Sequence, residues 1–208
     1  MPIVALVRAK AKKLMRDHPR ELRGLILSLA RQSQEQLAFE VARASKAAVL
    51  EMTPRDIESL LPILHDWCST DSFASFISGV AWREGVLSDD HIVKWAASPN
   101  LWTRRASLVS TVPLNLAARG STAPQGEPAR TLAICDFLVH DREDMIVKAM
   151  SWALRELARK DPKAVRSYMT RHGDRLAARV RREVANKLST GLKNPKRRFP
   201  STSKGSSA

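Results

Sequence analysis

The chain has 208 residues, of which 35 are Lys or Arg and 21 are Asp or Glu, so its net charge is +14. The apolar share of 44% excludes a disordered chain, and eight Gly with eleven Pro exclude a collagen-like one. Two cysteines, Cys68 and Cys135, cannot build a disulfide scaffold. No stretch approaches the ~20 apolar residues that span a bilayer. We therefore expect a soluble cytoplasmic monomer, associated with the nucleoid if the source is bacterial.

The positive charge is concentrated at the two ends of the chain. Residues 1–23 hold seven basic and two acidic side chains, residues 163–208 hold thirteen and two, and the middle is close to neutral. Basic ends can serve solubility alone, but a field at both ends also attracts polyanions, of which nucleic acid is the commonest. We expect one domain over residues 1–192, and a disordered basic tail without acids over residues 193–208.

Helical periodicity begins near residue 21 and recurs along the chain. Segments 21–30 and 34–50 place apolar side chains one helical turn apart, at Leu22, Leu25, Ile26 and Leu29 and then at Leu37, Val41, Ala44 and Ala48. Thr53 and Pro54 predict an N-cap followed by a first-turn proline. Alternating runs of β-branched residues, which would predict strands, are absent.

Later helices are predicted to start at Ser88, Asn100 and Asp161, and the last one directly after Gly173 and Asp174. Residues 119–128, rich in Gly, Ser and Pro, predict an exposed loop. About ten helices with short connections are typical of helix-pair arrays. The sequence therefore predicts an all-α fold, a superhelical array of HEAT-like antiparallel helix pairs (an α-solenoid) with a concave basic face.

Signatures of metal and nucleotide chemistry are missing. No histidine has a His or Cys partner at ligand spacing; the five are His18, His65, His91, His140 and His172. The sequence contains no P-loop, no GxGxxG and no GxSxG motif. We therefore expect neither a metal nor a cofactor.

Five tryptophans are the most distinctive residues, and four of them lie between positions 67 and 102. Trp67 and Asp71 are four residues apart in HDWCSTDSFASF, so a helix would place them on one face. A carboxylate beside an indole face suits a cation. Asp71 has an alternative role as the N-cap of SFASFISGV, and any of the tryptophans can instead be a packing residue of the core.

Two further segments combine an indole with basic side chains. In NLWTRRASL, Trp102 and Arg105 share a helical face, while Arg104 points about 100° away. A surface arginine over a buried tryptophan is the alternative. In KAMSWALRELARK one helical face carries an indole among cations, as expected for phosphate contacts around an aromatic contact: Lys148, Trp152, Arg155 and Arg159.

Three segments resemble, in this order, blocks of the DNA alkylation repair (AlkD-like) glycosylases: DWCSTDSFASFISG, KWAASPNLWTRRASLV and KAMSWALRELARKDP. The resemblance covers residues 20–190 and implies HEAT-like repeats, here with an incomplete first repeat. It implies excision of N3- and N7-alkylated purines from duplex DNA by cleavage of the N-glycosidic bond. By block position it implies that Asp71, Trp67, Trp152 and Arg105 are the catalytic residues. The expected DNA contacts are Arg105, Lys148, Arg155 and Trp102.

The residue types fit that chemistry. An alkylated purine already carries a positive charge, so it can leave without a general acid. A carboxylate such as Asp71 would stabilise the cationic charge that grows on the deoxyribose, and it would orient the attacking water. A non-catalytic HEAT-repeat scaffold that binds nucleic acid or protein remains the alternative interpretation. An RNA-binding repeat protein ranks lower, because no aromatic RNA motif is present.

Overall fold

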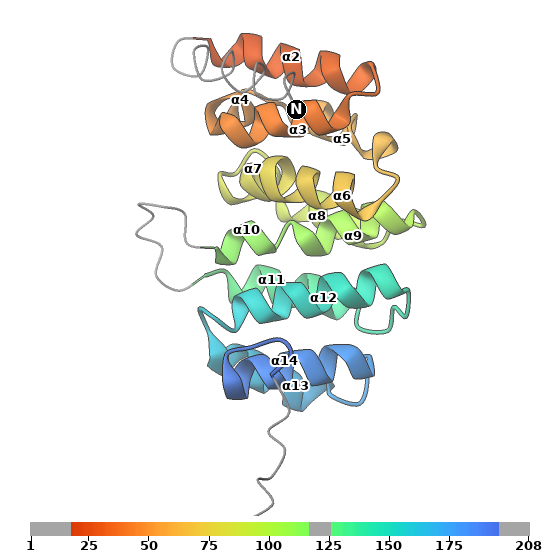
Figure 1. Cartoon of the computed structure of the whole chain (residues 1–208), viewed down its shortest axis with the longest axis vertical. Coiled ribbons are helices and arrows are strands. Elements are labelled where there is room, and N and C mark those ends of the chain that lie inside the picture. The colour runs from red at the N-terminus through yellow and green to blue at the C-terminus, as the bar shows by residue number, and fades with distance from the viewer. Residues whose placement is uncertain (1–17, 117–125, 196–208) are drawn as a thin grey trace, which may run out of the picture.

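The computed structural model describes residues 18–116 and 126–195, and every regular element within these ranges is helical. The helices pack in pairs that stack along the long axis of the molecule (Figure 1). The predicted all-α solenoid of helix pairs is therefore confirmed. None of the helices in these two ranges combines the length and the apolar character needed to cross a membrane.

The first four helices of the described residues are α2 (Pro19–Arg31), α3 (Glu35–Ala44), α4 (Lys46–Leu50) and α5 (Pro54–Glu58). The helix predicted over residues 34–50 is interrupted at Ser45, where the backbone is extended with φ −137° and ψ 93°. Ser45 Oγ accepts a hydrogen bond from the backbone N–H of Ala48 at 3.2 Å and so starts α4. The apolar period continues across this break, so periodicity alone does not reveal it.

The central elements are η1 (Leu61–Ile63), α6 (Trp67–Phe73), η2 (Ala74–Ser78), α7 (Gly79–Arg83), α8 (Asp89–Ala96), α9 (Leu101–Val109) and α10 (Val112–Asn115). A π-helical turn, η2, joins α6 to α7 without a break. At Gly79 a Cβ atom would meet the carbonyl oxygen of Ser110 at 2.7 Å and Cγ of Pro113 at 2.8 Å. The close approach of α7 and α10 therefore depends on a residue without a side chain.

Within the range 126–195 the helices are α11 (Pro128–Phe137), α12 (Asp144–Leu157), α13 (Pro162–His172) and α14 (Ala178–Thr190). The helix predicted directly after Asp174 starts only at Ala178, because the backbone N–H groups of Arg175 and Leu176 donate to the carbonyl of His172 and form a turn. The predicted loop 119–128 lies outside the described residues up to position 125, and Pro128 already begins α11. The predicted tail 193–208 lies outside them from position 196.

Side-chain caps confirm three of the predicted helix starts. Thr53 Oγ1 accepts from the backbone N–H of Asp56 at 3.2 Å and starts α5. Asn100 Oδ1 accepts from the backbone N–H groups of Trp102 and Thr103 at the start of α9. The side chain of Asp161 starts α13 in the same way. Each cap satisfies backbone donors that a helix leaves without an internal partner.

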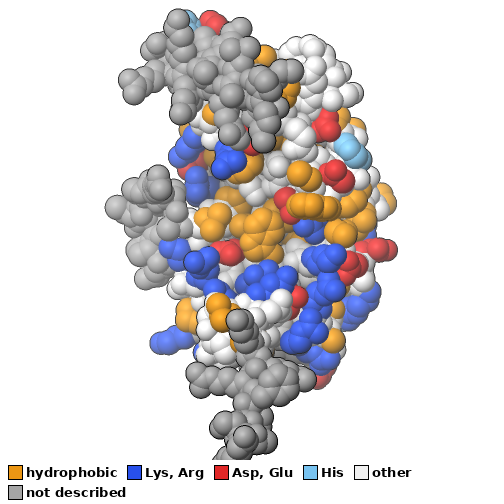
Figure 2. Space-filling model, in the orientation of Figure 1, with side chains coloured by type: hydrophobic (Ala, Val, Ile, Leu, Met, Phe, Trp, Pro, Cys, Tyr) orange, Lys and Arg blue, Asp and Glu red, His pale blue; other side chains and the backbone are white. Residues whose placement is uncertain are grey.

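Helices α6, α9, α12 and α14 follow one another along one face of the molecule, while α8, α11 and α13 form the layer behind them (Figure 1). Apolar side chains fill the space between the layers, and among the largest fully buried ones are Trp82, Trp95, Phe39 and Phe73. Figure 2 shows hydrophobic side chains at the centre of the face and Lys and Arg side chains gathered over its α12–α14 end. Two of the five tryptophans are therefore core residues.

Candidate functional site

The start of α6 sets the positions of Trp67 and Asp71. Asp66 is its N-cap: Oδ1 accepts from the backbone N–H of Ser69 at 2.7 Å. Trp67 is consequently the first residue of the helix, and Asp71 follows one turn later inside it. The alternative role of Asp71 as an N-cap is wrong, because Asp66 occupies that position and the helix continues past Asp71 into η2.

Asp71 forms a bidentate ion pair with Arg105 of α9. Nε of Arg105 donates to Oδ1 of Asp71 at 2.8 Å, and Nη2 donates to Oδ2 at 2.9 Å. The third nitrogen of the guanidinium, Nη1, donates to the backbone carbonyl of Met145 in α12. Arg105 therefore connects α6, α9 and α12, and it fixes the orientation of the carboxylate in its plane.

The pair is removed from water. Arg105 is 5% exposed and the Asp71 side chain 18% exposed. Burial raises the pKa of Asp71 above its ordinary value, and the negative charge of Asp66 adds to this rise, while Arg105 opposes both through its hydrogen bonds and its charge. The site thus holds a carboxylate in a poorly solvated environment, where its field acts strongly on a nearby cation.

The tryptophans differ in their exposure. Trp67, one turn from Asp71, is 58% exposed, a large value for an indole. Trp152 of α12 and Trp102 of α9 are partly buried and pack against the core. The predicted helical spacing, which places Trp67 and Asp71 one turn apart on α6, is confirmed, whereas the roles of Trp67, Trp102 and Trp152 at the site stay predictions.

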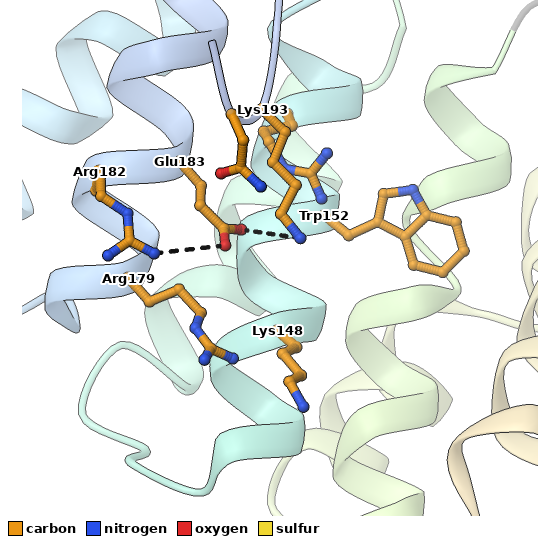
Figure 3. A pocket seen from close by; sticks show the side chains of 8 residues that line it. Lys148, Trp152, Arg179, Arg182, Glu183 and Lys193 are labelled. Carbon is orange, nitrogen blue, oxygen red and sulfur yellow. Dashed lines mark ion pairs between the residues drawn. The ribbon is translucent and has the colours of Figure 1, made fainter. Parts of the chain in front are cut away.

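A basic pocket of about 500 Å³ lies between α12 and α14, and we call it the α12–α14 pocket. It brings together Trp152, Lys148 and Arg155, as the sequence predicted for one face of α12. Its other lining residues come from α14 and from the segment after it: Arg179, Arg182, Glu183, Lys193 and Asn194 (Figure 3). These five residues were not predicted from the sequence, because their only signal is the general basic character of the C-terminal region.

Two other predicted basic residues lie elsewhere. Arg159 follows α12 and lines a different pocket with Glu156 and Lys160. Arg104 points away from Arg105, as predicted, and its Nε donates to Oδ2 of Asp141 at 2.9 Å. Within the described ranges, no three His, Cys, Asp or Glu side chains are placed to hold a metal ion.

Comparison with known proteins adds one finding. The model of a family described as DNA alkylation repair enzyme matches residues 4–188. This match includes α6, α9, α12 and nearly all of α14, and it ends before Lys193 and Asn194. A search of curated proteins found no match.

Proposed function

The chain belongs to the DNA alkylation repair enzyme family and so has a role in DNA repair, and from this premise we propose that it is a monofunctional DNA glycosylase. Its substrate is duplex DNA that carries N3- or N7-alkylated purines, and its reaction is hydrolysis of the N-glycosidic bond. The observation that carries the proposal is the ion pair between the partly buried Asp71 and the buried Arg105, with Asp71 one helical turn from the exposed indole of Trp67.

The reaction begins with an activated leaving group. The alkylated purine is cationic, so when the bond between C1′ and the base nitrogen breaks, the electron pair neutralises the base and no general acid is required. Positive charge then develops on the deoxyribose. The Asp71 carboxylate stabilises this charge, and it accepts a proton from the water that adds to C1′, which leaves an abasic sugar.

The surrounding residues bind and orient the reacting nucleotide. The indoles of Trp67 and Trp152 attract the cationic sugar through their faces, an interaction worth about 0.5–2 kcal/mol each. Arg105 keeps the Asp71 carboxylate ionised and aligned. Lys148 and Arg155 of the α12–α14 pocket bind strand phosphates, while Trp102 and Arg105 are further DNA contacts.

A matched pair of carboxylate variants tests the role of Asp71. We expect Asp71→Asn to lower release of 3- and 7-methylpurines from methylated duplex by about 100-fold or more, because the amide cannot carry the stabilising charge. Release is measured by chromatography of the free bases together with counting of abasic sites. Asp66→Asn is the control: it removes a negative charge one turn away, while asparagine still caps α6.

The outcomes separate the two interpretations of the fold. Asp71→Asn leaves the buried Arg105 without a charged partner, so we also expect a lower melting temperature, and circular dichroism must verify that the variant is folded at the assay temperature. Wild-type excision by a folded Asp71→Asn variant would contradict the catalytic role. A wild-type protein that binds the duplex but releases no base would favour the non-catalytic scaffold.

A further inference from the structure

The segment after α14 turns back toward the α12–α14 pocket. Gly191 adopts a left-handed conformation with φ 75°, which ends the helix and reverses the chain. Lys187 Nζ donates to the Gly191 carbonyl at 2.7 Å, and Asn186 Nδ2 donates to the Lys193 carbonyl at 3.0 Å. These contacts place Lys193 and Asn194 in the wall of the pocket, beyond the part of the chain that the family model matches.

A buried carboxylate organises the pocket. Glu183 is 5% exposed, and Ser151 Oγ donates to its Oε2 at 2.6 Å. Lys193 Nζ lies 3.5 Å from Oε2, and Arg182 Nη2 lies 3.9 Å from Oε1, so that Glu183 lies between these two cations (Figure 3). A buried charge requires such partners, and Glu183 thereby holds Lys193 and Arg182 at the pocket.

The cations of the pocket outnumber its one acid. Lys148, Arg155, Arg179, Arg182 and Lys193 surround the single carboxylate of the lining. Lys148 and Arg179 also share Asp144 at the rim, at 2.7 and 2.8 Å.

Arg155 forms no ion pair with a carboxylate of the described residues. Its Nε donates to the hydroxyl of Ser151 at 3.2 Å, and in the part of the chain that the structure describes no carboxylate lies within ion-pair distance of it. Burial lowers the pKa of Arg155, and the negative charges of Glu183 and Glu156 oppose this shift only in part. The pocket therefore retains positive charge for a ligand.

We propose that the α12–α14 pocket is a phosphodiester subsite for a DNA strand, and that Lys193 completes it together with Arg179 and Arg182. Trp152 lines this pocket and is also the second indole of the proposed catalytic site, so the bound phosphate belongs to a nucleotide near the lesion. Glu183 is a positioning residue that keeps Lys193 and Arg182 directed at the phosphate. The inference rests on the proposed function, because it takes duplex DNA as the ligand.

Salt-dependent binding tests the inference without requiring catalysis. Duplex affinity is measured by fluorescence anisotropy between 50 and 200 mM KCl, and the slope of log K against log salt counts phosphate contacts at about 0.9 per contact. We expect Lys193→Ala to reduce the steepness of this slope by about 0.9 and Lys193→Arg to restore it. Lys163→Ala is the matched control, since Lys163 is exposed on α13 in the layer behind.

Each outcome bears on one proposal. An unchanged slope for Lys193→Ala, or an equal loss for Lys163→Ala, overturns the phosphate subsite even if the enzyme releases methylpurines normally. A reduced slope in a protein that releases no base supports the subsite and contradicts the glycosylase. In an active enzyme we expect Lys193→Ala to raise KM for methylated duplex and to leave kcat unchanged, because Lys193 contacts the strand and no reacting atom.

Discussion

Arg105 donates hydrogen bonds to both carboxylate oxygens of Asp71 and so influences whether Asp71 is protonated. Burial raises the pKa of Asp71, and Arg105 is the main influence that lowers it. Catalysis in the proposed mechanism needs the ionised carboxylate, so activity is lost as the pH falls through the pKa of Asp71. Any change that weakens Arg105 as a partner moves that loss toward neutral pH.

We therefore expect Arg105→Gln to shift the acidic limb of the kcat–pH profile to higher pH, since glutamine donates hydrogen bonds but carries no charge. The profile is measured with saturating methylated duplex between about pH 4 and 8. Arg104→Gln provides the control, because the neighbouring arginine pairs with Asp141 and leaves Asp71 untouched. An acidic limb that stays in place in Arg105→Gln would show that Arg105 does not set the charge of Asp71.

The sequence predicts one half of this arrangement and misses the other half. A four-residue spacing on a helix is enough to place Asp71 beside Trp67. The ion pair joins residues 34 positions apart on different helices, and no local pattern states which helices pack together. The predicted contact of Arg105 with a DNA phosphate stays a prediction. In the structure, the guanidinium is engaged by Asp71 and by the carbonyl of Met145.

At the scale of elements, the contact between α7 and α10 depends on Gly79. A methyl group there would lie 2.7 Å from the Ser110 carbonyl oxygen and 2.8 Å from that of Ala74. We expect Gly79→Ala to lower the free energy of unfolding by about 1–3 kcal/mol, because the backbone must shift to admit the methyl group. Urea denaturation followed by circular dichroism measures the change.

Gly24 of α2 is the natural control for that experiment. A Cβ atom at Gly24 would have no heavy atom within 4 Å, apart from its own helix and its chain neighbours. Alanine in a helix interior is favoured over glycine by roughly 0.5–1 kcal/mol, so we expect Gly24→Ala to stabilise the protein. Packing therefore predicts that the free energy of unfolding falls in Gly79→Ala and rises in Gly24→Ala. A change in the same direction in both variants would contradict the close approach of α7 and α10.

Helix starts were predictable where a polar side chain satisfies the first turn, as at Thr53, Asn100 and Asp161. The break at Ser45 could not be predicted, because serine is tolerated inside helices and the apolar period continues on both sides. The π-helical turn η2 was missed for a related reason, since its residues Ala74–Ser78 carry no distinctive residue type.

The whole molecule combines a neutral central face with a basic end. The Asp71–Arg105 pair joins α6 to α9, and the α12–α14 pocket lies toward the end of the face where Lys and Arg side chains gather (Figure 2). Composition and helix spacing predicted the solenoid and the location of charge along the chain. They could not predict that residues of α14 and Lys193 converge with α12 on one pocket, because that depends on how successive helix pairs stack.

A net charge of +14 affects how fast the protein finds DNA as well as how tightly it binds. Electrostatic steering raises association rates by about 10- to 1000-fold and is screened by salt. We expect the association rate constant for duplex DNA, measured by stopped-flow anisotropy, to fall at least about tenfold between 20 and 200 mM KCl. A rate constant that hardly changes over this range would exclude long-range attraction by the basic end.

The exposure of Trp67 also provides a spectroscopic signal. Indoles in water emit at longer wavelengths than indoles in a protein interior, and Trp82 and Trp95 are almost fully enclosed while Trp67 is mostly in solvent. A molecule that covers the Asp71 site changes the surroundings of Trp67 and leaves those two interior fluorophores as they are. The red edge of the emission spectrum, to which Trp67 contributes together with the partly exposed Trp102 and Trp152, is consequently an intrinsic, label-free reporter of occupancy on this face of the molecule.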